Sequence, residues 1–201
     1  MGPIGLMRQM GLMRSSNMDS DKKFLAQRGR YKELIVYKKA QCIYDITYYF
    51  IHNYIDAGDR TADQMLQAAR SGKQNIVEGL SASTTSRETE IRLINVAKSS
   101  FKELLEDYED YLRVRGLELW PVGSEKAEQT RKICKEQSSS AYYIEAIKVR
   151  SAETIANIAL VLLHQEDYLL KRVFEKLKRD FKENGGIKEE LYLVRKELRK
   201  K

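Results

Sequence analysis

Apolar residues recur at steps of three and four along most of the chain, the spacing of one face of an α-helix. The first such run predicts a helix over residues 31–56 that ends at a Gly58-Asp59 turn. A second helix is predicted over residues 61–80, with Thr61 and Gln64 as a capping box at its start. The apolar stripe of the first helix is Val36, Ala40, Ile43, Thr47, Phe50 and Tyr54.

A third helix is predicted after a short polar loop over residues 81–84. Thr85 and Glu88 have the spacing of another capping box, and the apolar pattern then continues to about Arg115, before Gly116. The stripe of this helix is Ile94, Ala97, Phe101, Leu104, Tyr108 and Tyr111.

Two more helices complete the pattern, a short one over residues 124–135 and a long one over residues 141–182. The long helix is expected to end at Asn184-Gly185-Gly186, because glycine readily stops a helix. Four long amphipathic helices with short connections predict an all-α fold, an antiparallel up-down four-helix bundle with a short C-terminal helical extension. The stripe of the last long helix is Ile155, Ile158, Leu162, Leu169 and Val173.

The 201 residues fit one domain with extensions, and the chain has only two prolines to interrupt helices. We expect a disordered or extended segment over residues 1–28, the four-helix bundle over residues 29–183, and a basic C-terminal suffix over residues 184–201. No apolar run approaches the roughly 18 residues of a membrane span, and the N-terminus lacks the apolar core of a secretory signal. A cytoplasmic protein that does not enter the membrane is therefore expected.

Residues 67–79, QAARSGKQNIVEG, combine the helical rhythm with small residues. Small side chains on the apolar stripe let a partner helix come close, so we interpret the segment as a structural signature. Its polar members are expected to tie the helix to its neighbours, although they could instead line a ligand site. The signature residues are Arg70, Gly72, Asn75, Glu78 and Gly79.

The net charge of +7 is concentrated at the two ends of the chain. Residues 1–40 hold nine Lys or Arg against three Asp or Glu, and residues 171–201 hold twelve against six. Basic ends on a nearly neutral body suit contact with RNA or DNA, and the alternative is a solvated tail that only aids solubility. The candidate nucleic-acid-binding residues are Lys171, Arg172, Lys176, Lys178, Arg179, Lys182, Arg195 and Lys196.

The first helix is apolar on more than one side, at Ile35, Tyr44, Tyr48 and Ile51 besides its main stripe. One seam of a bundle cannot bury all of these residues, which predicts a homo-oligomer. The tyrosines that crowd this helix could stack on bases, but we favour their packing against a neighbouring subunit.

The residue patterns of common metal and catalytic sites are missing from the sequence. Neither His52 nor His164 follows a Glu by three residues, which excludes the usual di-iron bundle motif. Cys42 and Cys134 lack the paired spacing of a zinc site and are expected as reduced thiols rather than a disulfide. We therefore expect no metal, no cofactor and no catalytic residue.

Acidic residues crowd the segment ELLEDYEDYL, residues 103–112. Glu103, Asp107 and Asp110 share one helix face there. We interpret them as a solvated face that pairs with basic residues of another helix or subunit, and a catalytic carboxylate cluster is the alternative.

Several segments resemble a bacterial four-helix bundle family that includes proteins encoded by intervening sequences of 23S ribosomal RNA genes. The resemblance rests on DRTADQM at 59–65, QAARSGKQNIVEG at 67–79 and SSFKELLEDYEDYL at 99–112. Residues 164–186, HQEDYLLKRVFEKLKRDFKENGG, resemble the subgroup of four helix bundle suffix domain proteins. The resemblance implies an up-down bundle, commonly a ring-like homopentamer, without established catalytic activity.

A related family, the accessory variability determinant of diversity-generating retroelements, is a basic pentamer that binds nucleic acid and a reverse transcriptase. The resemblance therefore implies RNA or DNA, and a reverse transcriptase or other protein, as partners. We expect a non-enzymatic oligomeric bundle with a nucleic-acid or ribonucleoprotein-associated accessory role. The alternative is a protein-interaction scaffold that binds no nucleic acid.

Overall fold

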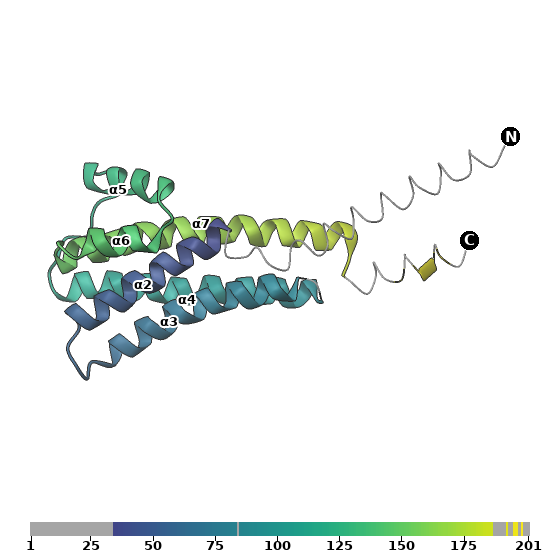
Figure 1. Cartoon of the computed structure of the whole chain (residues 1–201), viewed down its shortest axis with the longest axis horizontal. Helices are drawn as coiled ribbons and strands as arrows, with labels where there is room; N and C mark the ends of the chain where they lie inside the picture. Colours follow the sequence, from purple (N-terminus) through teal and green to yellow (C-terminus); the bar gives the residue numbers. More distant parts are fainter. Residues whose placement is uncertain (1–33, 84, 187–191, 193–194, 197, 199–201) are drawn as a thin grey trace. The chain divides into compact units, whose positions relative to one another are not determined.

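The computed structural model describes residues 34–83, 85–186, 192, 195–196 and 198 (Figure 1). The chain divides into two units, Met1–Leu34 and Ile35–Lys201, and the helices described below belong to the second unit. The predictions for residues 1–28 lie outside the described residues, as does most of the helix predicted for residues 187–201.

The described part of the chain is built from α-helices and contains no β-strand, so the all-α prediction is confirmed. Four long helices and two short ones follow one another along the second unit (Figure 1). They are α2 (Ile35–Tyr54), α3 (Arg60–Ala82), α4 (Arg87–Val114), α5 (Glu125–Glu136), α6 (Ser140–Ile147) and α7 (Ala152–Asn184).

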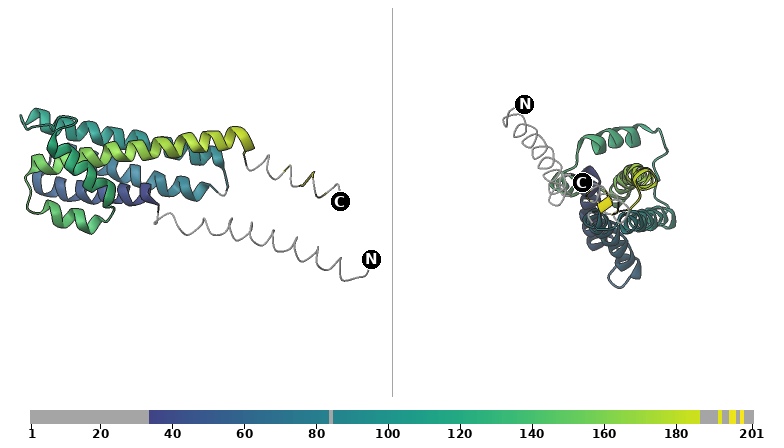
Figure 2. Two further views of the ribbon diagram at one scale, coloured as in Figure 1. Left: turned by 90° about the horizontal axis from the view of Figure 1, so that it is seen from above. Right: turned by 90° about the vertical axis from the view of Figure 1, so that its right-hand side faces the viewer.

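The four long helices pack around a common core, with α2 and α4 each in contact with both α3 and α7. Helices α3 and α4 run antiparallel, since Gly72 faces Phe101 while Gly79 faces Ile94. The short helices lie at the edge of this group, α5 against α7 and α6 against α2 (Figure 2). The all-helical bundle is thus observed, and the up-down order of the whole bundle stays a prediction.

The core is formed by the stripes that the sequence predicts. All six predicted stripe residues of α4 are buried, as are the first five of α2 and the first three of α7. Tyr54, Leu169 and Val173 are half-buried and pack against this core. The Tyr108 hydroxyl, deep in the core, is satisfied because it donates to Oγ1 of Thr47 at 3.1 Å.

The starts of α3 and α4 differ from the predicted capping boxes. Asp59 caps α3 by accepting a hydrogen bond from the Thr61 amide at 2.9 Å, and Ser86 caps α4 by accepting from the Thr89 amide at 3.2 Å. Asp and Ser are strong N-cap residues, and each reaches the free amides of the first turn better than the threonine that was predicted. The predicted stops at Gly116 and Gly185 are observed, and both glycines have positive φ.

The long helix predicted over residues 141–182 is wrong in one respect, because it consists of two helices. α6 ends at Ile147 and α7 begins at Ala152, after Ser151 caps it by accepting from the Thr154 amide. The Tyr54 hydroxyl also donates to the Arg150 carbonyl at 3.0 Å, which fixes the turn against α2. The turn contains no glycine or proline, so the local sequence gives little sign of the break.

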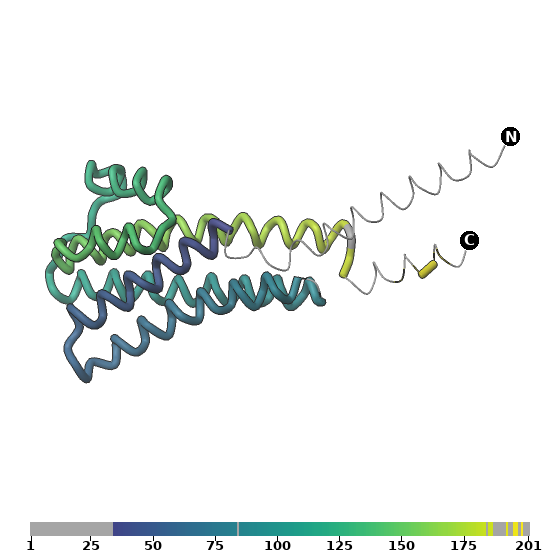
Figure 3. Tube along the Cα trace, in the orientation of Figure 1, coloured from purple at the N-terminus to yellow at the C-terminus, as the bar shows by residue number. Residues whose placement is uncertain are grey.

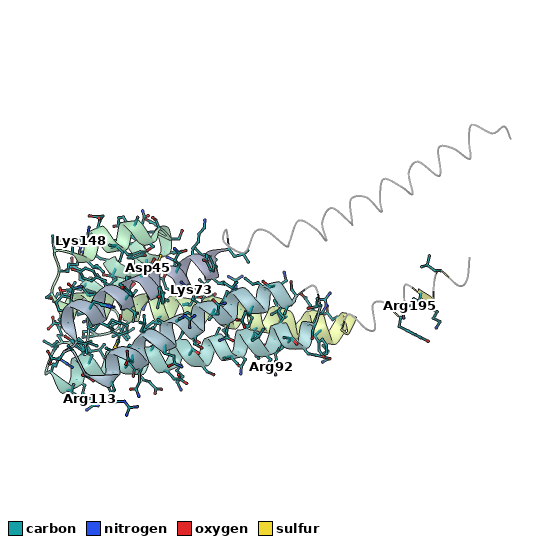
Figure 4. All side chains as sticks on the ribbon, turned by 60° about the horizontal axis from the view of Figure 1, so that its bottom comes forward. Asp45, Lys73, Arg92, Arg113, Lys148 and Arg195 are labelled. Carbon is teal, nitrogen blue, oxygen red and sulfur yellow. The ribbon has the colours of Figure 1, made fainter. Side chains whose placement is uncertain are left out.

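The break lets α6 fold back along α2 and cover part of its surface. The Ser140 hydroxyl donates to the Asp45 carboxylate across this contact. Ile51 is buried within the monomer. The ammonium of Lys73, which is labelled in Figure 4, lies over the Tyr44 ring at 3.9 Å from the ring centre. Ile35 and Tyr48, the other two apolar residues outside the main stripe of α2, stay substantially exposed.

Candidate nucleic-acid interface

The basic candidates of the last long helix are distributed over more than one face of α7. At 33 residues α7 is much longer than the 20-residue α2, and it continues past the start of α2 (Figures 1 and 3). The part of α7 beside that start carries most of its cations. Four of the eight predicted binding residues, Lys171, Arg172, Lys176 and Arg179, line a single groove there.

This α2/α7 groove has a volume of about 720 Å³ and is formed by the first turn of α2 and the second half of α7. Its apolar residues are Ile35, Val36, Leu169 and Val173. Glu175 is the one carboxylate among the described residues that line it. The groove therefore combines an apolar floor with a strongly positive rim.

An exposed aromatic ring stands at the edge of the α2/α7 groove. Tyr168 is 59% exposed, and the Arg172 guanidinium lies 5.9 Å from the centre of its ring. Tyr168, Arg172, Glu175 and Arg179 recur at steps of three and four, so one face of α7 presents the ring beside two of the cations and the single carboxylate. Tyr168 is not among the sequence-based candidates, although its position on the face of Arg172 and Arg179 can be read from the sequence.

The remaining basic candidates lie elsewhere. Lys178 lies over the Phe174 ring at 4.8 Å, where Lys98 of α4 also approaches at 5.5 Å. Lys182 is exposed in the last turn of α7. Arg195 and Lys196 are exposed helical residues, and Arg195 is labelled in Figure 4.

The signature segment 67–79 is mainly a packing element of α3. A Cβ atom on Gly72 would lie 2.6 Å from the Phe101 ring, so only glycine fits there without a shift of that ring. The polar tie between helices is made by Ser71 and Ser100, whose hydroxyl oxygens lie 2.9 Å apart. Gly79 is buried as well, but a Cβ atom on it would lie 3.4 Å from its nearest neighbours.

The expected polar ties of the other signature residues are corrected by the structure. The Asn75 amide donates to the Ser71 carbonyl at 2.8 Å, within its own helix. Glu78 accepts from the Gln74 amide at 3.3 Å, again within α3, and Arg70 is exposed. At i and i+4 these partners are the nearest groups available, so the side chains have no need to reach another helix.

The acidic trio of α4 is divided between two environments. Glu103 and Asp107 line a polar groove of about 350 Å³ between α3 and α4. The other polar residues that line it are Gln64, Gln67, Ser71 and Ser100. Partial burial raises the pKa of Asp107, and the charges of Asp110, Glu103 and Glu106 raise it further. Asp110 pairs instead with Arg113 of its own helix at 2.7 Å.

Two buried ionisable side chains, absent from the sequence-based predictions, lie near each other on α2 and α7. Lys39 is 2% exposed, and its ammonium donates to the carbonyls of Cys134 and Gln137 at the end of α5. Glu166 is fully buried, and neither carboxylate oxygen has a hydrogen-bond partner among the described residues. Burial raises the pKa of Glu166 well above its usual value, and the nearby charge of Lys39 opposes that rise.

The two cysteines lie next to this pair and are free thiols, as predicted. Burial raises the pKa of Cys42 to about 12 and also raises that of Cys134, so both stay protonated and unreactive at neutral pH. Within the described residues, no three His, Cys, Asp or Glu side chains form a group that could hold a metal ion. In that same part of the chain, none of the helices is long and apolar enough to span a bilayer.

Comparison of the chain with protein-family models, with curated proteins and with solved structures finds no match. The candidate interface therefore rests on the residues and geometry of this chain.

Proposed function

We propose that this chain is a non-enzymatic nucleic-acid-binding helical bundle that holds RNA or DNA by its phosphates at the α2/α7 groove. The observation that carries the proposal is the convergence of Lys171, Arg172, Lys176 and Arg179 on one groove that contains a single carboxylate among its described residues. The bundle supplies a rigid support for these cations, because the underlying stripe of α7 is packed into the core.

Phosphate binding gains most of its free energy from the release of counterions condensed on the nucleic acid. Four cations within about three turns of one helix match the close spacing of charges along a strand. Side chains that hold a phosphate through its charge carry no base information, so little sequence preference is expected. A protein with little sequence preference suits an accessory role on many nucleic acids better than regulation at defined sequences.

The resemblance described above extends this proposal. It supports membership of the 23S ribosomal RNA intervening-sequence family, assembly as a homopentamer in the cytoplasm, and a reverse transcriptase or other protein as a partner. The basic suffix, with Arg195 and Lys196, would add contacts for the nucleic acid. This contribution of the suffix can be tested by measuring the salt dependence of RNA affinity, as described in the next paragraph, for a chain that ends at Gly186.

The test is the affinity of the full chain for a fluorescently labelled single-stranded RNA, measured by anisotropy over a range of salt concentrations. Replacing the four groove cations by glutamine should weaken binding at low salt. It should also reduce the slope of log K against log salt by about 3, since each contact with a single strand contributes about 0.7. The variant is K171Q/R172Q/K176Q/R179Q.

A matched control removes four exposed cations from other surfaces, R60Q/R92Q/K132Q/K135Q. This control should lose much less of the slope, although both variants change the net charge equally. Equal losses in the two variants would mean that only the overall charge matters and would reject the groove as the site. An intact chain that fails to bind at low salt would reject nucleic-acid binding and favour the scaffold.

A further inference from the structure

We propose that the α2/α7 groove takes unpaired bases, so that the ligand is single-stranded RNA or DNA rather than a duplex. This inference rests on the proposed function and adds the structural class of nucleic acid to it. It follows from the floor of the groove and from one exposed ring, neither of which is needed to bind phosphates.

The floor is apolar where a phosphate site would need only cations. Ile35, Val36, Leu169 and Val173 form it, and Ile35 remains 42% exposed. A duplex keeps its base faces stacked inside and presents phosphates and groove edges to a protein. Such a ligand would leave this apolar surface unused, whereas the flat faces of unpaired bases can cover it.

The ring of Tyr168 stands beside the floor and is largely exposed to solvent. Arg172 lies near its face, at 5.9 Å from the ring centre, and also belongs to the rim. Exposed aromatic rings beside cations are the usual platform for single strands, because a base stacks on the ring while its phosphate meets the cation. Stacking accepts any base, which agrees with the low sequence preference expected of the rim.

The geometry also limits how a strand can lie. The four cations of the rim all belong to α7, over residues 171–179, and the floor is shared between α7 and the first turn of α2. A strand running along α7 would place its phosphates toward the rim and its bases toward Tyr168 and the floor. A duplex could touch the rim with one backbone, but its bases could not reach the floor.

The experiment compares Tyr168→Ala, Tyr168→Phe and the intact chain on two labelled ligands of one sequence, a single strand and its duplex. Tyr168→Ala should weaken binding of the single strand by about 5- to 150-fold with no change in the salt slope. Tyr168→Phe should keep the affinity, because the ring is retained. The duplex should bind more weakly than the single strand and be insensitive to both substitutions.

A 2-aminopurine base in the single strand reports stacking directly, because its fluorescence is quenched when it stacks. Quenching should occur with the intact chain and with Tyr168→Phe but be lost with Tyr168→Ala. The control is Tyr142→Ala, which removes another exposed tyrosine, on α6 and outside the groove, and should leave affinity and quenching unchanged.

Equal affinity for the duplex, with no effect of Tyr168→Ala, would overturn the inference and leave phosphate binding by the rim intact. Absence of binding to either ligand at low salt would remove the proposed function together with it. A change in the mass of the assembly on Tyr168→Ala, measured by light scattering, would instead identify the groove as a contact between copies and would also overturn the inference.

Discussion

At the scale of single residues, Gly72 and Gly79 provide a matched test of how closely α3 and α4 pack. Both are buried glycines of α3, but a Cβ atom would meet the Phe101 ring at 2.6 Å from Gly72 and its nearest neighbours at 3.4 Å from Gly79. Gly72→Ala should destabilise the fold by about 1–2 kcal/mol, because overpacking outweighs the gain in helix propensity. Urea unfolding measures this free energy.

Gly79→Ala is the control for that substitution. It gains the same propensity, about 1 kcal/mol at most, and meets contacts that a small shift can relieve. It should therefore be neutral or stabilising. If both variants unfold at the same urea concentration as the parent, close packing at Gly72 is not what restricts that position to glycine.

Glu90 should make the stability of the fold depend on pH. Its pKa is raised from the ordinary 4.5 to about 7, mainly by burial; the charge of Arg87 opposes the rise and that of Asp180 in α7 adds to it. A carboxyl whose pKa is higher in the folded chain than in the unfolded chain stabilises the fold fully below about pH 4.5. This stabilisation is lost as the pH rises through about 7, the pKa in the fold. Relative to the parent, Glu90→Gln should gain about 2–3 kcal/mol between pH 4.5 and pH 8.

The measurement is the free energy of unfolding of Glu90→Gln and parent in parallel across that pH range. Glu88→Gln removes an exposed carboxyl from the same turn and should change stability by about 0.5 kcal/mol or less. A constant difference between Glu90→Gln and the parent would show that Glu90 has the same pKa in the folded and the unfolded chain, and it would contradict the raised pKa.

The sequence predicted the stripes but not the charges inside them. Lys39 lies three residues after Val36 and four before Ile43, Glu166 lies four after Leu162, and Glu90 lies four before Ile94. Each charge therefore sits in line with an apolar stripe, which is a readable signal. A long side chain at the edge of a stripe usually reaches solvent, however, and only the packed neighbours show that these do not.

At the scale of elements, Lys39 holds the end of α5 onto the bundle. Its ammonium donates hydrogen bonds to the Cys134 and Gln137 carbonyls. The same positive charge lies near the buried Glu166 carboxyl. Lys39→Met should destabilise the chain by about 2–5 kcal/mol, because it leaves two buried carbonyls without their donor and removes the positive charge that lies near the buried Glu166 carboxyl. Hydrogen exchange should show the largest loss of protection in α5.

The double variant K39M/E166L separates the two causes. Removing both charges abolishes the uncompensated carboxyl, so part of the lost stability should return. Protection of α5 should stay low, since its terminal carbonyls still lack the ammonium. Full protection of α5 in Lys39→Met would contradict this account of the contact.

Element boundaries show what local sequence can and cannot predict. The stops at Gly116 and Gly185 follow from backbone conformations that favour glycine. The break between α6 and α7 depends on Ser151 as a cap and on the Tyr54 contact to Arg150, which joins residues 96 positions apart. A contact of that kind lies beyond any local pattern, and so the two helices were predicted as one.

At the scale of the whole molecule, the candidate site was predicted in part. The cations of α7 were identified from their density, but which of them share a groove depends on where α2 begins beside α7. That register is set by packing of stripes far apart in the chain. The same packing folds α6 onto α2 and covers part of the apolar surface of α2 that could otherwise contact another copy of the chain.

Assembly can therefore be predicted from the apolar surface that folding leaves exposed. Tyr48 of α2 is 49% exposed and stacks on the exposed His52 ring at 4.2 Å, away from the core. Aromatic residues are enriched at the centres of protein interfaces, and a head-to-tail contact repeated from copy to copy forms a ring when its rotation closes. Light scattering at micromolar concentration should return a multiple of the 23.4 kDa chain, and the family resemblance implies five copies. Tyr48→Ser should lower that mass, whereas Tyr142→Ser, at a tyrosine of similar exposure on α6, should not. A monomer mass for the parent chain would contradict assembly altogether, and an unchanged assembly in Tyr48→Ser would place the contact on another surface.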